Sequence, residues 1–192
     1  MSEFMIVNGN KNLIVCFGGM NLQMYGIPPF EFLNYLSTNY KDNYDLLFYI
    51  DKHQKWYHKG IDGISTTINE TCEYLNTKIS QYEKVIFMGT SSGGYAAILF
   101  GSLCKVTNVV AFIPQTKLIN PISREYRDLK TIINPNTKYL LYGDLKYPVN
   151  DTHHISQCEN LESFSNVKII KKDVFLKHMR DSGEIKEILD SL

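Results

Sequence analysis

The sequence lacks an excess of either charge. Its 192 residues include 20 Lys and Arg and 20 Asp and Glu, so the formal net charge is zero. A balanced chain has no general electrostatic attraction to nucleic acid or to an anionic lipid surface. We therefore expect no nucleic-acid partner and no charge-driven membrane binding.

Long hydrophobic runs are also missing. No stretch approaches the roughly 20 apolar residues that a helix needs to cross a bilayer. The first residues, Met1 to Met5, do not combine a basic region with an apolar segment as a secretory signal does. We expect neither a membrane span nor a signal peptide.

Cysteine is scarce, and the four cysteines are far apart in the chain. Cys16, Cys72, Cys104 and Cys158 show no metal-binding spacing. Most lie in apolar strand or helix patterns, where a free thiol behaves as a small hydrophobic group. We expect a reduced, cytoplasmic protein without a structural metal ion.

What the sequence does contain is a strand, a sharp turn and a helix in KVIFMGTSSGGYAAILFGSLC, residues 84–104. Gly89, Ser91 and Gly93 fit the pattern G-x-S-x-G, which places a serine on a strand-to-helix elbow. Glycine is needed beside the serine because such a turn leaves no room for Cβ atoms. The first amides of the helix point at the serine, where negative charge develops during acyl transfer. The pattern predicts that Ser91 is a nucleophile.

Two other interpretations of this turn are a phosphate-binding loop and a plain turn that only packs a helix on a sheet. A Walker loop ends in Gly-Lys-Ser/Thr, and a dinucleotide loop requires G-x-G-x-x-G. Neither pattern occurs in this turn, so we predict no cofactor. The plain turn stays open, but the strand before it and the helix after it favour the nucleophile.

Short apolar runs alternate with segments of helical spacing along the whole chain. The expected strands are 4–7, 13–17, 46–50, 85–88, 109–113, 138–142 and 167–170. The expected helical segments are 29–40, 64–79, 92–104, 124–133, 151–164 and 178–192. This alternation predicts an α/β fold in which a mostly parallel sheet of about six strands carries helices on both faces, in one domain over residues 1–192.

The Ser91 elbow and the order of these elements resemble the α/β-hydrolase superfamily, from Leu13 to the C-terminus. The stretches WYHKG (56–60), GTSSGGYAAILFG (89–101) and AFIPQ (111–115) also resemble a group of small hydrolases often encoded beside surface-polysaccharide genes. The resemblance implies a three-layer sandwich. The chain is too short for the first antiparallel strands of larger members, and only a minimal lid is expected.

In this superfamily an acid and then a histidine follow the serine, the histidine after the last strand. His178 occupies that place and is the predicted base, the alternative being a solvated histidine near a helix start. His153 and His154 follow the acid candidates too closely and are expected on the helix 151–164. His53 and His58 precede Ser91 and do not fit the order.

For the acid we favour Asp151 over Asp144, because the acid must reach across to the histidine loop. The residue of this pair that is not the acid would be a surface residue or a helix N-cap. Asp173 and Asp181 are expected to be structural. The resemblance further implies an oxyanion hole made by the amide of Ser92 and an amide of the loop after the early strand. Gly19 and Met20 are equal candidates for the latter, and a plain tight turn is the alternative there.

These residues predict a serine esterase that acts through an acyl-enzyme on a small polar ester such as an acylated sugar. A shallow pocket for a short acyl group is expected. The residues expected to line it are Tyr25, Trp56, Tyr57, His58, Tyr95 and Gln115. An acyltransferase or thioesterase with the same triad, and a non-catalytic binding module of the same fold, remain the alternatives.

Overall fold

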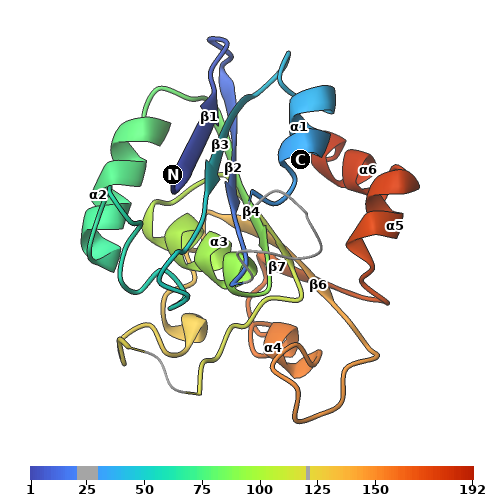
Figure 1. Ribbon diagram of the computed structural model, residues 1–192. Coiled ribbons are helices and arrows are strands. Elements are labelled where there is room, and N and C mark those ends of the chain that lie inside the picture. The colour runs from blue at the N-terminus through green and yellow to red at the C-terminus, as the bar shows by residue number, and fades with distance from the viewer. Residues whose placement is uncertain (21–29, 120–121) are drawn as a thin grey trace.

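The computed structural model describes residues 1–20, 30–119 and 122–192 (Figure 1). Within them, seven strands form one sheet in the order β1-β3-β2-β4-β5-β6-β7. The strands are β1 (Glu3–Ile6), β2 (Asn12–Phe17), β3 (Asp45–Tyr49), β4 (Lys84–Thr90), β5 (Asn108–Phe112), β6 (Lys138–Gly143) and β7 (Val167–Lys171). The prediction of a mostly parallel sheet is confirmed, with seven strands rather than about six.

One strand pair of the described sheet is antiparallel. β1 pairs with β3 in register Glu3 with Tyr49 and Ile6 with Leu46, while the other neighbouring strands are parallel. The expectation that the chain has no room for an initial antiparallel strand was therefore wrong. A short strand of four residues is enough to extend the sheet at this edge.

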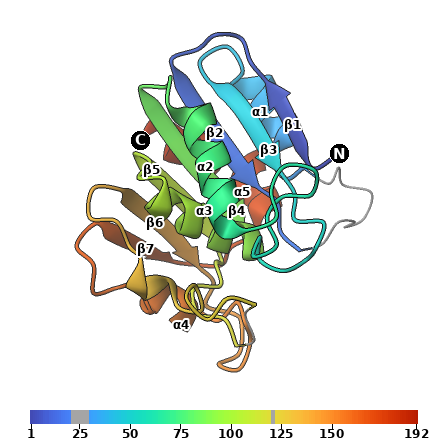
Figure 2. The same cartoon turned by 90° about the vertical axis from the view of Figure 1, so that its left-hand side faces the viewer.

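Helices cover both faces of the sheet, which gives three layers (Figure 2). The helices α2 (Ile68–Ile79) and α3 (Ser92–Leu103) pack on one face, and α1 (Leu33–Asn39), α5 (Leu176–Asp181) and α6 (Glu184–Asp190) pack on the other. The final helix is split at Gly183, which has φ 85°. The expected helix over 151–164 is only α4 (Ser156–Glu159), and the segment 124–133 holds a single 3-10 turn, Leu129–Thr131.

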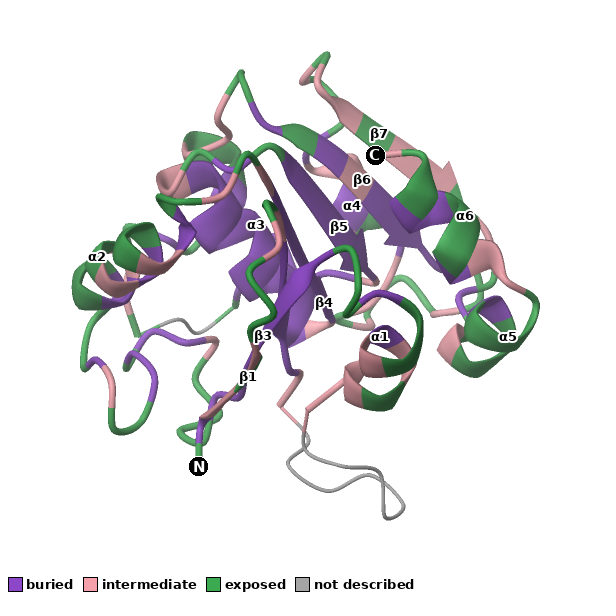
Figure 3. Ribbon diagram, turned by 90° about the horizontal axis from the view of Figure 1, so that it is seen from above, coloured by how far each residue is buried: buried purple, intermediate pink, exposed green. Residues whose placement is uncertain are grey.

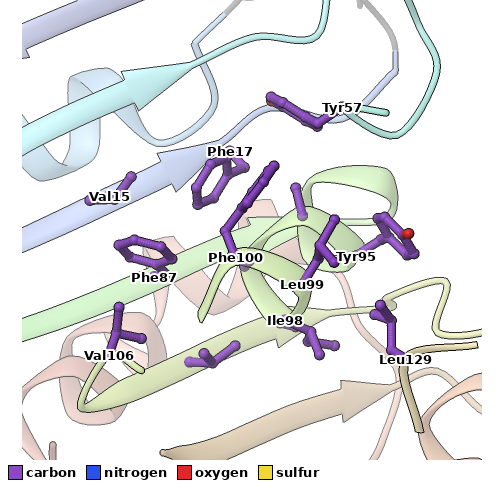
Figure 4. Packing of buried hydrophobic residues seen from close by; sticks show 14 of the residues in the cluster. Val15, Phe17, Tyr57, Phe87, Tyr95, Ile98, Leu99, Phe100, Val106 and Leu129 are labelled. Atoms are coloured by element: carbon purple, nitrogen blue, oxygen red, sulfur yellow. The ribbon is translucent and has the colours of Figure 1, made fainter. Parts of the chain in front are cut away.

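The core consists of two apolar clusters, one on each face of the sheet. Successive side chains of β2 alternate between them, so Val15 and Phe17 face α3 while Ile14 and Cys16 face α1. The ring of Phe17 stacks on Phe100 of α3 at a centroid distance of 5.6 Å (Figure 4). Figure 3 shows the buried strands between helices whose outer sides are exposed. This packing holds α3 against β2 and β4, and so sets the position of the turn between β4 and α3.

Candidate active site

The turn between β4 and α3 places Ser91 in a strained conformation. β4 ends at Thr90, α3 begins at Ser92, and Ser91 between them has φ 55° and ψ −117°. A non-glycine residue with such a backbone costs about 1–3 kcal/mol and persists only where the surroundings enforce it. Here the Ser91 amide donates to the carbonyl oxygen of Phe112 (2.9 Å), and the Ser91 carbonyl accepts from the amide of Tyr95 (2.9 Å). Neighbouring elements thus hold the strained serine in place.

The glycines of the elbow are required because β2 passes very close to it. A Cβ atom on Gly93 would lie 2.1 Å from the carbonyl oxygen of Phe17, and one on Gly89 would lie 2.5 Å from the carbonyl of Gly93. Both distances are far below van der Waals contact. The glycine pattern in the sequence therefore has a physical cause, the close approach of three backbone segments around Ser91.

The Ser91 hydroxyl belongs to a chain of hydrogen bonds with an imidazole and a carboxylate. Ser91 Oγ lies 2.7 Å from His153 Nε2, and His153 Nδ1 lies 3.1 Å from Asp151 Oδ1. Because a carboxylate only accepts, the imidazole proton lies on Nδ1, and Nε2 is free to accept from the hydroxyl. The His153 and Asp151 side chains are 26% and 34% exposed. This is the geometry of a nucleophile, a general base and an orienting acid.

The base and the acid come from one loop, residues 144–155, which follows β6. Asp151 Oδ1 also accepts from the amide of His153 (2.8 Å), so the carboxylate caps its own turn. The amide of Asp151 donates to the carbonyl of Pro148 (2.8 Å). The ring of Tyr147 lies 5.4 Å from that of His153, centroid to centroid. A two-residue separation between acid and base is possible because this loop is a series of tight turns.

The structure does not bring His178 to Ser91. His178 is exposed on α5, a helix that packs on the sheet through Met179. The imidazole that contacts the serine is His153, which replaces His178 as the candidate base. His153 was not expected as the base because it follows the acid candidates closely and because residues 151–164 were predicted to be helical, whereas 151–155 are turns. The two adjacent histidines just after Asp151, at the carboxyl end of a strand, were the available indication.

Asp144, the other candidate for the acid, is fully buried and does not contact His153. Its carboxylate accepts from the amides of Lys146 (2.9 Å) and Val174 (3.0 Å) and pairs with Lys146 Nζ (3.0 Å). Burial raises the pKa of the Asp144 carboxyl, but these hydrogen bonds outweigh it and leave the pKa below its ordinary value. Asp144 thus links the loop after β6 to the segment before α5, rather than lying at the surface. Asp173 and Asp181 are exposed, and their structural role stays a prediction.

The loop after β2 runs beside the elbow. A Cβ atom on Gly19 would lie 3.4 Å from the carbonyl oxygen of Thr90 and 4.0 Å from Ser92 Oγ. The Met20 carbonyl accepts from Gln54 Nε2 (2.7 Å), which ties the loop to the segment after β3. Gly19 and Ser92, both predicted for the oxyanion hole, are therefore close in space, and Met20 follows Gly19 directly.

Three residues predicted to line the substrate pocket are buried and hold loops together instead. The Tyr57 hydroxyl donates to the carbonyl oxygens of Gly18 (3.0 Å) and Tyr49 (3.1 Å). His58 Nε2 lies 2.7 Å from the hydroxyl of Tyr95, and both side chains are buried. Their polar atoms are satisfied inside the protein, so Tyr57, His58 and Tyr95 are supports of the site.

A hydrogen-bonded chain orients His58. Its Nδ1 accepts from the amide of Ser123 (3.0 Å), so the proton is on Nε2 and points to Tyr95, whose hydroxyl donates to the carbonyl of Tyr126 (2.7 Å). Burial lowers the pKa of His58, although the charge of Asp51 opposes this. The buried neutral imidazole links the segment after β3 to α3 and to the segment after β5.

Trp56 and Gln115 are the other predicted pocket residues that the structure describes, and they lie near the carboxyl edge of the sheet. Trp56 is half-buried with φ 53°, and its Nε1 donates to Gln115 Oε1. The carboxylate of Asp51 stabilises the turn that contains Trp56, because it accepts hydrogen bonds from the amides of Lys55 (2.7 Å) and Tyr57 (2.9 Å). Tyr25, the remaining predicted pocket residue, lies outside the described residues.

Sequence reasoning did not single out Glu31, a buried carboxyl beside the elbow. A Cβ atom on Gly19 would lie 3.2 Å from Glu31 Oε1. Burial raises the pKa of the Glu31 carboxyl to about 7. Among the described residues, Glu31 Oε2, Thr90 Oγ1 and Ser92 Oγ are buried without a hydrogen-bond partner. A lone Glu in an aromatic segment gives no sequence pattern that identifies such a group.

The part of the chain that the structure describes contains no group of three or more His, Cys, Asp and Glu residues that could hold a metal ion. None of its helices has the length and apolar character to span a membrane.

Comparison with known proteins shows similarity at the level of structure. The capsule O-acetyltransferase of Neisseria meningitidis serogroup A superposes with a TM-score of 0.65 at 15% identity, covering 96% of this chain and 89% of that one. An alpha/beta hydrolase enzyme from a sediment metagenome of the Mar Chica lagoon, Morocco, gives 0.58 at 16% identity, with 98% and 92% covered. FphF, a fluorophosphonate-binding serine hydrolase of Staphylococcus aureus, gives 0.61 at 12% identity, with 94% and 82% covered.

Sequence comparison gives no corresponding match. No protein-family model matches the chain, and no curated protein matches it in sequence. The structural likeness, at these identities, establishes the fold. The chain has the α/β-hydrolase fold.

Proposed function

We propose that this protein is a serine hydrolase that cleaves carboxylic esters through an acyl-enzyme. The observation that supports this most strongly is the connection from Ser91 Oγ to His153 Nε2 (2.7 Å) and from His153 Nδ1 to Asp151 Oδ1 (3.1 Å). It occurs on a strained elbow at the carboxyl edge of a parallel sheet, where ligands of such folds bind. A serine needs such a partner because its hydroxyl is a weak nucleophile at its ordinary pKa.

In the proposed reaction, Ser91 Oγ bonds to the ester carbonyl carbon while its proton moves to His153 Nε2. Asp151 stabilises the imidazolium that forms and holds the ring in the correct tautomer. The negative charge on the carbonyl oxygen is stabilised by the amide of Ser92, with an amide of Gly19 or Met20. The alcohol then leaves with the proton from Nε2. A water molecule, deprotonated by the same nitrogen, then bonds to the acyl carbon, the bond from that carbon to Ser91 Oγ breaks with return of the proton from Nε2 to Oγ, and the carboxylic acid leaves.

A second candidate is acyl transfer to a hydroxyl group other than that of water. It is favoured by the likeness to the capsule O-acetyltransferase, of which a variant is known in complex with CoA. The same residues serve both reactions, since only the acceptor of the acyl group differs, and a thioester can replace the ester as donor. Product analysis with an acyl donor and a sugar acceptor separates the two. Acylated sugar above the level formed without enzyme would favour transfer over hydrolysis.

The proposal is tested with a fluorophosphonate probe, which reacts with activated serines. We expect stoichiometric labelling of the protein, with the adduct on Ser91, and no labelling of Ser91→Ala. Ser92→Ala is a matched control for the loss of a hydroxyl in the same turn. Labelling of Ser91→Ala at the rate of the unmodified protein would refute the nucleophile. A folded protein that does not react at all would instead indicate a binding module of this fold.

A further inference from the structure

A cavity lies on the α1 and α5 face of the sheet. It has a volume of about 500 Å³, within the range of about 300–1,000 Å³ that is usual for small-molecule sites. Leu33 of α1 and Leu176 of α5 line it from opposite sides, and Ile113 and Ile185 contribute to its walls. Figure 3 shows α1 and α5 on the same side of the sheet.

The cavity reaches the carboxyl end of β4. Thr90, the residue before Ser91, lines it. The side chains of Ile86 and Met88 lie in the core cluster of this face, and Thr90 continues that alternation at the end of the strand. The cavity therefore ends one residue before Ser91 along the chain.

The polar groups of the cavity are not evenly distributed. Glu31 and Thr90 line it near the elbow, and within the described part of the chain Glu31 Oε2 and Thr90 Oγ1 are buried without a hydrogen-bond partner. Leaving such groups unpaired is costly, which indicates a site that a ligand or water completes. Lys177 and Arg180 also line the cavity but are exposed, and Arg180 Nε binds Asp181 (3.0 Å). The walls between these ends are mainly aliphatic and aromatic.

We propose that this cavity binds a medium-length apolar acyl group of the substrate, with the carbonyl end at Ser91 and the tail between α1 and α5. The proposal rests on the proposed function of Ser91. The mainly aliphatic and aromatic walls of the cavity match the apolar tail of such a group. This cavity differs from the shallow pocket for a short acyl group that the sequence led us to expect.

The test is the ratio of kcat/KM for p-nitrophenyl octanoate to that for p-nitrophenyl acetate. Each buried methylene contributes favourably to binding, so we expect a ratio above about 10 for the unmodified protein. Leu33→Trp and Leu176→Trp fill the cavity from opposite walls and should each lower the ratio at least tenfold, since a pocket discriminates chain length by available space. Val7→Trp adds the same ring to an exposed position outside the cavity and serves as the control.

Fluorophosphonate labelling of each variant separates the two ideas. If Ser91 is labelled but acetate is preferred, or if both cavity variants keep the ratio of Val7→Trp, the acyl cavity is refuted while the hydrolase stands. If the unmodified, folded protein is not labelled, the proposed function fails and the acyl role of the cavity fails with it. Two variants on different helices are used because one of them can fail to fold.

Discussion

The position of Ser91 depends on the absence of side chains at the neighbouring glycines as well as on the groups that contact it. Gly93 and Gly89 allow the elbow to approach β2, because a Cβ atom on either would lie within 2.5 Å of a carbonyl atom. This requirement is local and leaves a pattern in the sequence, which is why the elbow could be predicted from residues 89–93. Glu31 leaves no pattern, because its burial depends on the segment before α1 lying close to Gly19, which is distant in the sequence.

Glu31 should make stability depend on pH. Its pKa is about 7 in the folded protein, raised by burial from the ordinary 4.5. Between these values the folded protein keeps a proton that the unfolded chain has released, so stability falls as pH rises from about 4.5 to 7. The expected loss is about 3 kcal/mol, and Glu31→Gln should abolish it. Urea unfolding at pH 5 and pH 8 measures it, and an unchanged difference between the two proteins at both pH values would contradict the burial of Glu31.

Among the elements, the loop 144–155 determines which imidazole and which carboxylate lie near Ser91. The sequence predicted β6 and placed Asp144 and Asp151 after it, but it extended the next helix back to residue 151. Asp151 instead caps a turn by accepting the amide of His153 (2.8 Å), which turns the imidazole toward Ser91. The competition between a helix and a turn closed by a side chain depends on where the loop can dock. That docking is a tertiary contact, so the order of elements could not reveal it.

Asp144 should hold this loop in place without touching the reacting groups. Asp144→Ala removes one buried carboxylate and leaves the Val174 and Lys146 amides without their acceptor. We expect a loss of about 2–4 kcal/mol in the free energy of unfolding, with slower labelling of Ser91. Asp42→Ala, at an exposed position, should change stability by less than about 0.5 kcal/mol. Equal stability of the two variants in urea unfolding would show that Asp144 is not a structural link.

At the scale of the molecule, alternation of strands and helices determines what the sequence can predict. Buried parallel strands are continuous apolar runs, and all seven described strands, including the short antiparallel β1, were located to within about two residues. Their carboxyl ends lie at one edge, which brings the loops after β2, β4 and β6 together. The sequence cannot determine which of these loops bends back over the elbow. The family order favoured the segment after β7, whereas in the structure the imidazole comes from the loop after β6.

His153, and not His178, is the residue that we propose activates Ser91. The most direct measurement is the second-order rate of fluorophosphonate labelling for His153→Ala and His178→Ala beside the unmodified protein. We expect His153→Ala to react at least about 100-fold more slowly, because the general base is lost, and His178→Ala to react at the unmodified rate. Rapid labelling of His153→Ala together with a loss of labelling in His178→Ala would show instead that His178 is the base.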